Sequence, residues 1–386
     1  MNITEITSLY QTNKESLLSG RYITNLHITP LLEALKSEPD FIVSEIGKSV
    51  LGKPISAIKV GTGKKRLLLW SQMHGNESTT TKALFDFINA LKHPDQALKN
   101  LKEACTFYII PILSPDGADA YTRLNAIDID LNRDAQTLSQ PESKVLRAAF
   151  NAFKPHYCFN LHGQRTIFSA GTTNKVATVS FLSPSQDEER TVTDSRKVGM
   201  DIIAEMNRTL QQLIPGQVGR YDDSFNINCV GDSFQSLNVP TILFEAGHYE
   251  NDYEREQTRF YIFSSYLTAF NYIAQHDVLG ENYNDYFNIP ENDKCFYDII
   301  IRGANVGTEE NPEILDVAVL FVEKLINNKI AFSSKIEALG LGANYYGHKE
   351  VNANKMRVLG ADEKPLKVGV ENDFVTIGAD KFLLKL

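Results

Sequence analysis

Residues 66–78 read RLLLWSQMHGNES, a stretch in which an apolar run is soon followed by a histidine and a glutamate. The near-continuous apolar run over residues 66–71 is typical of a strand that is buried on both faces of a sheet. Over residues 77–91 the apolar side chains recur at helical spacing, which predicts a helix directly after the strand. A buried strand that leads into a helix is the repeating unit of a mostly parallel sheet.

The same alternation continues on both sides of this stretch. Two apolar segments flank the turn SVLGKP and predict a hairpin, further strands are expected at 107–113, 156–162 and 240–245, and helices at 141–153, 194–213 and 254–275. We therefore expect an α/β catalytic domain over residues 1–285, with a mixed, mostly parallel central sheet and helices on both faces. Residues 286–386 change character and predict a small C-terminal α+β or β-rich domain of unknown role, with one helix over residues 312–327.

Composition excludes several classes of function. The formal net charge of −9 argues against nucleic acid or an anionic membrane as a partner. Residues 1–13 lack the basic start and apolar run of a signal peptide, and no stretch approaches the ~18 apolar residues of a membrane span. The cysteines are far apart and form no CxxC pair, so we expect them to be reduced, as in a cytoplasmic protein: Cys105, Cys158, Cys229 and Cys295.

Three side chains have the pattern of a metal site. His74 and Glu77 stand three residues apart across the turn from strand to helix, so both can point at one ion. Alone, this pair is more often a helix start whose glutamate favours the helix dipole. His162 ends another strand-like run, HYCFNLHG, where a core histidine bonded to the backbone is the alternative. Together the three match a catalytic zinc site, which takes three protein ligands and keeps one position open.

Two further segments carry candidate functional residues. The segment YTRLNAIDIDLNRDA contains Arg123, Asn132 and Arg133 in one loop between the two halves of the predicted metal site. Adjacent asparagine and arginine side chains offer an amide and a bidentate fork to a carboxylate, although surface arginines are usually only solvated. Glu245 ends the apolar strand in TILFEAGH. A carboxylate there is either bonded to the backbone or catalytic, and its position makes it the candidate general base.

Taken in order, these motifs resemble the zinc carboxypeptidase superfamily. The matching segments lie within residues 41–275 and read IGKSVLGKPISAIKVG, HGNE, SPDGADAYTRLN, DIDLNRD, FNLHG and ILFEAGH. The resemblance implies an α/β domain with one Zn²⁺ per chain. It also implies residue roles, with His74, Glu77 and His162 as zinc ligands, Glu245 as the base, Arg123 at the scissile carbonyl, and Asn132 and Arg133 on the free carboxylate of the substrate.

The sequence departs from the family pattern around the substrate. The segment between residues 133 and 162 is short for the pancreatic type and leaves less wall around the pocket. Tyr221 is the nearest candidate for the tyrosine that the family places on a mobile loop before the base, with Phe225 as the alternative. The substrate-selecting position falls within residues 229–234, where Asp232 would favour a basic side chain if it lined the pocket.

The sequence leaves three kinds of function open. The first is a metallocarboxypeptidase that removes a C-terminal residue from a peptide. The second uses the same site on other substrates, as an N-acyl amino acid deacylase of the succinylglutamate desuccinylase and aspartoacylase kind, or as a cell-wall peptide amidase. The third is a binding protein without activity, whose signature would be a lost ligand or base. Since none is lost, we expect an enzyme acting on a peptide or an N-acyl amino acid.

Overall fold

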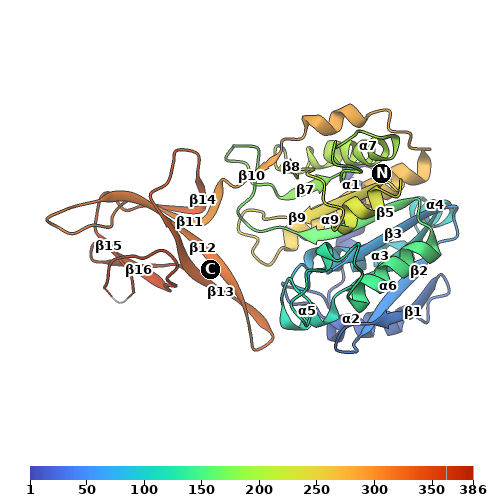
Figure 1. The fold of residues 1–386 in the computed structure, drawn as a ribbon, viewed down its shortest axis with the longest axis horizontal. Helices are drawn as coiled ribbons and strands as arrows, with labels where there is room; N and C mark the ends of the chain where they lie inside the picture. The colour runs from blue at the N-terminus through green and yellow to red at the C-terminus, as the bar shows by residue number, and fades with distance from the viewer. Residues whose placement is uncertain (362, 386) are drawn as a thin grey trace. The chain divides into compact units, whose positions relative to one another are not determined.

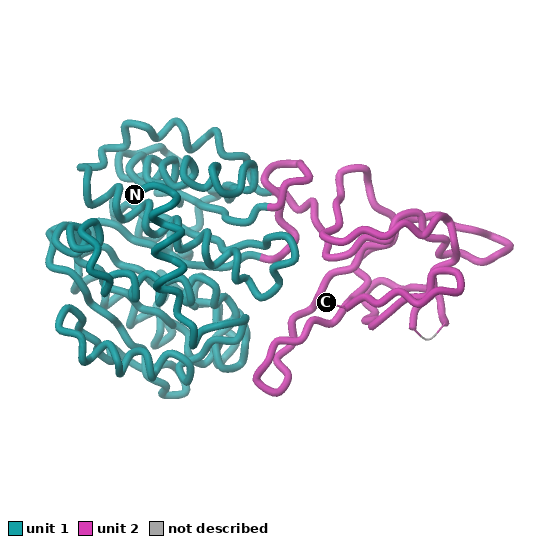
Figure 2. Tube along the Cα trace, turned by 180° about the vertical axis from the view of Figure 1, so that it is seen from behind, with its two compact units in different colours: residues 1–164, 177–292 teal, residues 165–176, 293–386 magenta. Residues whose placement is uncertain are grey.

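The structure is a computed structural model that describes residues 1–361 and 363–385. The chain divides into two compact units, which Figure 2 colours separately. The first comprises Met1–Gln164 and Ala177–Asn292, and the second comprises Arg165–Val176 and Asp293–Leu386. The boundary expected after residue 285 thus lies after Asn292 in the structure, and a short segment from the middle of the chain joins the second unit.

An eight-stranded sheet forms the centre of the first unit (Figure 1). Its strands follow the order β1-β2-β4-β3-β5-β9-β7-β8, with bounds β1 Phe41–Lys48, β2 Pro54–Val60, β3 Lys65–Ser71, β4 Cys105–Ile110, β5 Tyr157–Gly163, β7 Val179–Leu182, β8 Val218–Arg220 and β9 Thr241–Ala246. The central strands β4, β3, β5 and β9 are parallel to one another. Antiparallel pairs join β2 to β1 and β4, and β7 to β9. The mixed, mostly parallel sheet is confirmed.

Helices cover both faces of this sheet (Figure 1). One face packs against α1, α2, α3, α4, α7 and α9, and the other packs against α6 and α8. The bounds are α1 Ile3–Asn13, α2 Asn25–Leu35, α3 Thr79–Lys92, α4 Gln96–Ala104, α5 Pro115–Ala120, α6 Pro141–Phe153, α7 Asp194–Leu210, α8 Val230–Gln235 and α9 Glu256–Gln275, with short 3₁₀ helices η1 Leu131–Arg133 and η2 Tyr283–Asn288. No helix among the described residues is long and apolar enough to cross a membrane.

Strand β3 explains why its sequence is apolar without alternation. Leu67 and Leu69 lie in the core beneath α3 and α9, whereas Leu68 and Trp70 lie in the core beneath α6 and α8. All four side chains are fully buried. Because neighbouring residues of a strand point to opposite faces, a strand covered by helices on both sides needs apolar residues at every position.

The second unit is built from strands, which confirms the β-rich C-terminal region. Its strands are β6 Ser169–Ala170, β11 Phe296–Asn305, β12 Ile314–Ile326, β13 Lys329–Leu339, β14 Tyr346–Asn352, β15 Val358–Leu359, β16 Phe374–Ile377 and β17 Asp380–Leu383, with β10 Asn292–Asp293 at the boundary. One sheet has the order β13-β12-β11-β14 and another β15-β16-β17, and their side chains share a small apolar core.

The helix expected over residues 312–327 is wrong, because this segment is strand β12. Its apolar run fits either period, but Val317 and Val319 are β-branched and buried in the strand core. The following residues, Asn327 and Asn328, both have positive φ, at 50° and 60°. Two asparagines in this conformation make the two-residue turn that closes a hairpin, so β12 pairs with β13 along its length.

Candidate metal centre

His74 and Glu77 lie in the turn between the end of β3 and the start of α3. The backbone N–H of Glu77 donates to the carbonyl of His74 at 3.1 Å, which closes the turn and brings both side chains to one side. Gly75 is required between them, since a Cβ there would lie 1.8 Å from the backbone carbon of Gly117. The glycine of HGNE therefore allows this turn to pass close to the backbone of α5.

His162 and Glu245 reach the same edge of the sheet from β5 and β9. The two residues are direct neighbours in the parallel register of these strands. Strands β3, β5 and β9 are all parallel in this part of the sheet, so their carboxyl ends meet at one edge. The sheet topology thus gathers residues that are far apart in the sequence.

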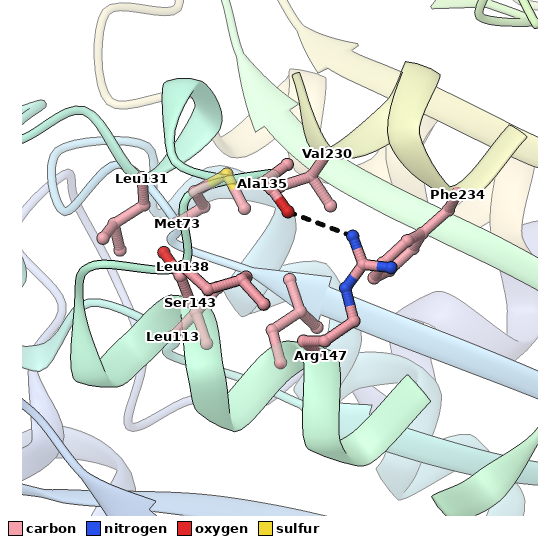
Figure 3. A pocket seen from close by; sticks show the side chains of 10 residues that line it. Met73, Leu113, Leu131, Ala135, Leu138, Ser143, Arg147, Val230 and Phe234 are labelled. Carbon is pink, nitrogen blue, oxygen red and sulfur yellow. Dashed lines mark hydrogen bonds between the residues drawn. The ribbon is translucent and has the colours of Figure 1, made fainter. Parts of the chain in front are cut away.

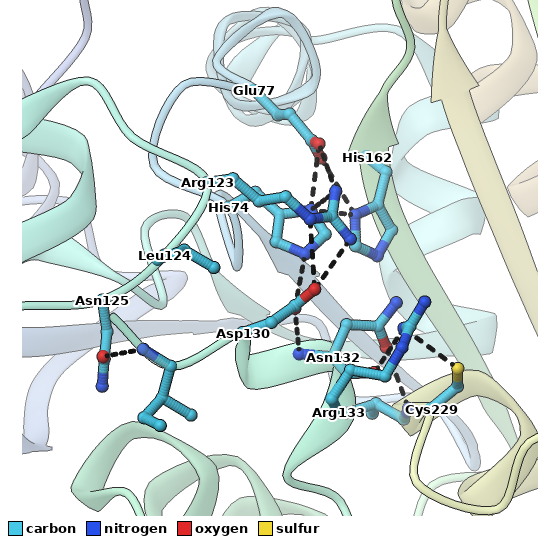
Figure 4. Close-up of polar contacts among 12 residues, drawn as sticks. His74, Glu77, Arg123, Leu124, Asn125, Asp130, Asn132, Arg133, His162 and Cys229 are labelled. Carbon is cyan, nitrogen blue, oxygen red and sulfur yellow. Dashed lines mark hydrogen bonds and ion pairs between the residues drawn. The ribbon is translucent and has the colours of Figure 1, made fainter. Parts of the chain in front are cut away.

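Three side-chain atoms converge at this edge (Figure 4). His74 Nδ1 and His162 Nδ1 lie 3.1 Å apart, and each lies 2.9 Å from an oxygen of Glu77. Bonds of ~2.0–2.1 Å at tetrahedral angles would separate zinc ligand atoms by about 3.3 Å, which is close to this arrangement. Within residues 1–361 and 363–385, this is the group whose atoms are placed to hold a metal ion.

The protonation of Glu77 and His162 suits metal binding, whereas the pKa of His74 is raised because, against the effect of burial, the charge of Glu77 and hydrogen bonds with Asp130 and Glu77 favour its charged form. Burial alone would raise the pKa of Glu77, but the charge of His74 and hydrogen bonds with His162 and His74 hold this pKa below its ordinary value. Burial lowers the pKa of His162, against the opposing effect of Glu77. An ionised glutamate and a neutral histidine are the states in which these residues bind metals. Two histidine nitrogens and one carboxylate are also a donor set that zinc accepts.

Asp130 contacts the ring nitrogen of His74 that points away from the other two metal-donor residues. The sequence did not predict this role for Asp130. Its Oδ1 lies 3.0 Å from His74 Nε2, and the same oxygen accepts from the backbone N–H of Asn132 at 2.9 Å. Its other oxygen receives Arg123 Nε at 3.1 Å and Nη2 at 3.0 Å. A carboxylate on the second nitrogen of a histidine fixes the orientation of a metal ligand. The signal in the sequence was the aspartate two residues before Asn132 in DIDLNRD.

Arg123 lies beside the ligand atoms themselves. Its Nη1 is 3.2 Å from His74 Nδ1 and 3.6 Å from Glu77 Oε1. Nearly half of its side chain, 46%, remains exposed, so the guanidinium can meet an incoming molecule. The structure thus brings Arg123 to the group formed by His74, Glu77 and His162.

Asn132 and Arg133 form a pair next to the start of α8 (Figure 4). Asn132 Oδ1 accepts from the backbone N–H of Val230 at 2.9 Å. Arg133 Nη1 donates to the carbonyl of Asn132 at 2.7 Å and to Cys229 Sγ at 3.2 Å. These contacts hold the pair in place while the other guanidinium nitrogens of Arg133 have no partner among the described residues.

Glu245 is a partly buried carboxyl group on β9, where it neighbours His162 of β5. Its Oε2 is buried and makes no hydrogen bond to any residue that the structure describes. Burial, followed by the negative charge of Glu77, raises the pKa of the Glu245 carboxyl well above its ordinary value. An unpaired buried carboxyl is costly, so its retention beside a candidate metal centre is a mark of function.

Comparison with known proteins agrees with this geometry. A family model described as zinc carboxypeptidase matches residues 28–213, which include His74, Glu77 and His162. Solved structures share the fold: a metallo-carboxypeptidase from Burkholderia cenocepacia has a TM-score of 0.53 at 18% identity and covers 65% of this chain and 70% of that one. The carboxypeptidase A from Helicoverpa armigera has a TM-score of 0.52 at 17% identity, covering 72% and 82%. Over residues 28–213 the chain is therefore similar to the zinc carboxypeptidases.

Relatives of known sequence match only in part. Carboxypeptidase 2 of Trichophyton tonsurans is 27% identical over 115 residues, which are 30% of this chain and 20% of that protein. Gamma-D-glutamyl-L-diamino acid endopeptidase 1 of Lysinibacillus sphaericus is 33% identical over 82 residues, 19% of this chain and 21% of that protein. The match thus spans about a fifth of the length of these curated relatives.

Two candidate substrate residues of this zinc carboxypeptidase-like chain lie near the edge of the site. Tyr221 follows β8, and its backbone N–H donates to the carbonyl of Phe181 at 3.0 Å. Burial and then the charges of Glu245 and Glu77 raise the pKa of Tyr221. Asp232 lies on α8, where its Oδ2 accepts from the backbone N–H of Asn226 at 3.2 Å and burial raises its pKa to about 7.

A small pocket lies beneath the loop that carries Asn132 (Figure 3). Leu131 and Val230, which flank the Asn132 contact, both line it, and the guanidinium of Arg147 donates to the carbonyl of Ala135 at its rim. Most of its other lining residues are apolar: Met73, Leu113, Leu138, Leu146 and Phe234, with Ser143 as the exception. These side chains belong largely to the core beneath α6 and α8, so the pocket is part of the support of the site.

Proposed function

We propose that this chain is a zinc metallocarboxypeptidase that cleaves the amide bond next to a free carboxylate and so removes the C-terminal residue of a peptide. The observation that carries the proposal is the convergence of three metal-donor atoms on one point, with the unpaired carboxyl of Glu245 on the neighbouring strand. The match to the zinc carboxypeptidase model over residues 28–213 and the shared fold support it.

The metal would be held by His74, Glu77 and His162, with one zinc ion per chain. Zinc at this position supplies Lewis-acid chemistry for hydrolysis of an amide. Asp130 keeps the imidazole of His74 in the orientation that its Nδ1 needs. Burial of His74 and His162 limits the access of other water molecules to these two side chains.

Glu245 would move the protons of the reaction. Hydrolysis of an amide needs a base that accepts a proton from water and an acid that returns one to the leaving amine. The carboxyl of Glu245, on the strand next to His162, is placed to accept the first proton and to return it in the second step. Arg123, beside the ligand atoms, would polarise the carbonyl of the scissile bond and stabilise the charge that develops on its oxygen.

Asn132 and Arg133 would select a free carboxylate. The guanidinium fork and the amide are complementary to a carboxylate, and Arg133 has nitrogens to spare for it. This pair is what distinguishes an enzyme that acts at a chain end from one that cuts within a chain. A charge-assisted hydrogen bond of this kind contributes about 1.5–3 kcal/mol.

A second candidate is the cell-wall peptide amidase. The match to the Lysinibacillus sphaericus endopeptidase favours it, because that protein is named for cleaving a gamma-D-glutamyl bond to a diamino acid. Both candidates use the same metal ligands and base. Tyr221 and Asp232 would contribute to substrate binding in either case, and the deacylase alternative remains a prediction.

The test is a matched pair of acyl dipeptides, one with a free C-terminal carboxylate and one amidated. We expect the purified zinc-loaded enzyme to prefer the free carboxylate, and Arg133→Ala to lower kcat/KM for that substrate by about 10–100-fold while changing the amidated one little. Arg208→Ala is the control, because Arg208 is an exposed arginine on α7. Equal losses on both substrates would remove Arg133 from this role, and hydrolysis of only gamma-D-glutamyl peptides would favour the second candidate.

A further inference from the structure

Asn160 is a buried amide on the strand that carries His162. Its side chain is 1% exposed, and neither its Oδ1 nor its Nδ2 makes a hydrogen bond to any residue that the structure describes. Burying a side-chain amide without partners costs free energy, so such groups are normally paired or removed. An amide that is left without partners beside a candidate active site has a reason to be there, such as a ligand that completes it.

The strand register places Asn160 two residues before His162, on the same face of the sheet as His162 and Glu245. Residues two apart on a strand share a face, so Asn160 lies on the same face as His162, one step of about 7 Å down the strand. On β9 the neighbour of His162 is Glu245, and the neighbour of Asn160 is Leu243. One row across the sheet therefore holds a metal-donor residue and the proposed base, and the next row holds the amide.

The start of α8 connects this second row to the carboxylate-binding pair. Cys229 and Val230 contact Arg133 and Asn132. The next residue, Gly231, faces Asn160, since a Cβ at Gly231 would lie 3.8 Å from Asn160 Nδ2. That Cβ would also lie 3.0 Å from Pro184 Cγ, closer than such contacts normally come. Glycine thus keeps the space in front of the amide free of a side chain.

We propose that Asn160 is a specificity-determining residue that binds the side chain of the C-terminal residue being released, and that this side chain is a neutral carboxamide, as in glutamine. The inference rests on the proposed function. A residue whose carboxylate is held by Asn132 and Arg133, and whose amide bond lies at His162 and Glu245, must place its side chain in the space between them. The start of α8, which contacts Asn132 and Arg133, also faces Asn160 at Gly231.

The chemistry of the amide selects the class of side chain. A carboxamide donates two hydrogen bonds and accepts others, and its natural complement is a second carboxamide that pairs with it reciprocally. A carboxylate would face the Asn160 oxygen without a donor, and an aliphatic side chain would leave both amide atoms unpaired. A site built around buried hydrogen-bonding groups rejects a ligand that cannot pair with them.

The test compares acyl dipeptides that end in glutamine, glutamate, lysine and leucine. We expect the wild-type enzyme to show a kcat/KM at least 10-fold higher for glutamine than for the other three. In Asn160→Leu, which is close in size but apolar, the ratio of glutamine to leucine should fall at least 30-fold. Isothermal titration of the same dipeptides into Glu245→Gln should show the same order of affinity, as a readout that does not depend on turnover.

Controls separate this inference from the proposed function. Cys158→Ala alters the same face of β5 one row further into the core, and its glutamine-to-leucine ratio should stay at the wild-type value. If Asn160→Leu does not fold, Asn160→Ser replaces it and should also lower the ratio. An enzyme that hydrolyses all four dipeptides without preference would overturn the role of Asn160 and leave the carboxypeptidase standing, whereas failure on every dipeptide would overturn both. A preference that survives in both variants would show that Asn160 is satisfied internally.

Discussion

Two clusters of buried charge in the first unit differ in how completely they are paired. Between α3 and α9, the guanidinium of Arg259 donates to both oxygens of Asp86 at 2.5 and 2.6 Å, and both side chains are fully buried. In the same network Lys82 lies 2.6 Å from Glu256. Every carboxylate of this helix network has a cation within hydrogen-bonding distance, so the network is complete in itself.

The metal centre is organised differently. Its two glutamates are partly buried and have no fully buried lysine or arginine as a partner among the described residues. Glu77 contacts the imidazoles of His74 and His162, and Oε2 of Glu245 makes no hydrogen bond to any residue that the structure describes. His74 and His162 turn their Nδ1 atoms toward each other at 3.1 Å, although two ring nitrogens of this kind attract only through a shared proton or ion. We infer that the network of Asp86 and Arg259 stabilises the fold, whereas the group at His74 and His162 is completed by a ligand.

The largest expected effect is a loss of turnover when the carboxyl group of Glu245 is replaced. Glu245→Gln keeps the size and hydrogen bonding of the side chain but cannot accept a proton. We expect kcat to fall by about 10²–10⁴-fold while zinc content and substrate affinity persist. Steady-state kinetics with elemental analysis checks this, and Glu103→Gln on the exposed side of α4 is the control. Near-parental turnover in a zinc-loaded Glu245→Gln enzyme would make Glu245 a structural residue.

The helix network should show the opposite behaviour. Asp86→Ala leaves the charge of Arg259 buried without its partner, which should lower the free energy of unfolding by about 3–5 kcal/mol. The hydrogen bonds of Asp86 go to Arg259 and to the backbone of Glu15, and not to a metal ligand. The amount of zinc bound per folded molecule should therefore not change. Denaturant unfolding and metal titration measure the two quantities. A variant that unfolds normally but loses zinc would break the distinction between the clusters.

A smaller effect is expected from the support of His74. Asp130→Asn removes the negative charge behind the imidazole, and we expect zinc affinity to fall by about 10–100-fold. Competition with a zinc chelator of known affinity gives the value. Asp128→Asn is the matched control, since Asp128 is exposed in the same loop and its positive φ of 61° suits asparagine. Equal affinities in the two variants would leave Asp130 without a role at the metal.

The comparison also explains what could be predicted from sequence. The metal ligands follow from local rules, because a histidine and a glutamate across a strand-to-helix turn, and a histidine at the end of a neighbouring strand, meet wherever the strands are parallel. The central sheet follows from apolar runs that only strands covered on both faces require. These features are written in short stretches of residues.

Other features depend on contacts between distant segments. Asp130 supports His74 across 56 positions of sequence, and an aspartate in a loop is more often a turn residue. The unpaired amide of Asn160 is visible only when its surroundings are known. The helix expected over residues 312–327 failed because an apolar run fits two periods, and pairing with β11 and β13 decided between them.

The central claim is that His74, Glu77 and His162 bind zinc, and the zinc content of His162→Ala tests it most directly. We expect one zinc ion per chain in the wild-type protein and none in the variant after dialysis, because two remaining ligands do not hold a catalytic zinc. His276→Ala, an exposed histidine just after α9, should keep the wild-type content. A full equivalent of zinc in folded His162→Ala would contradict the account.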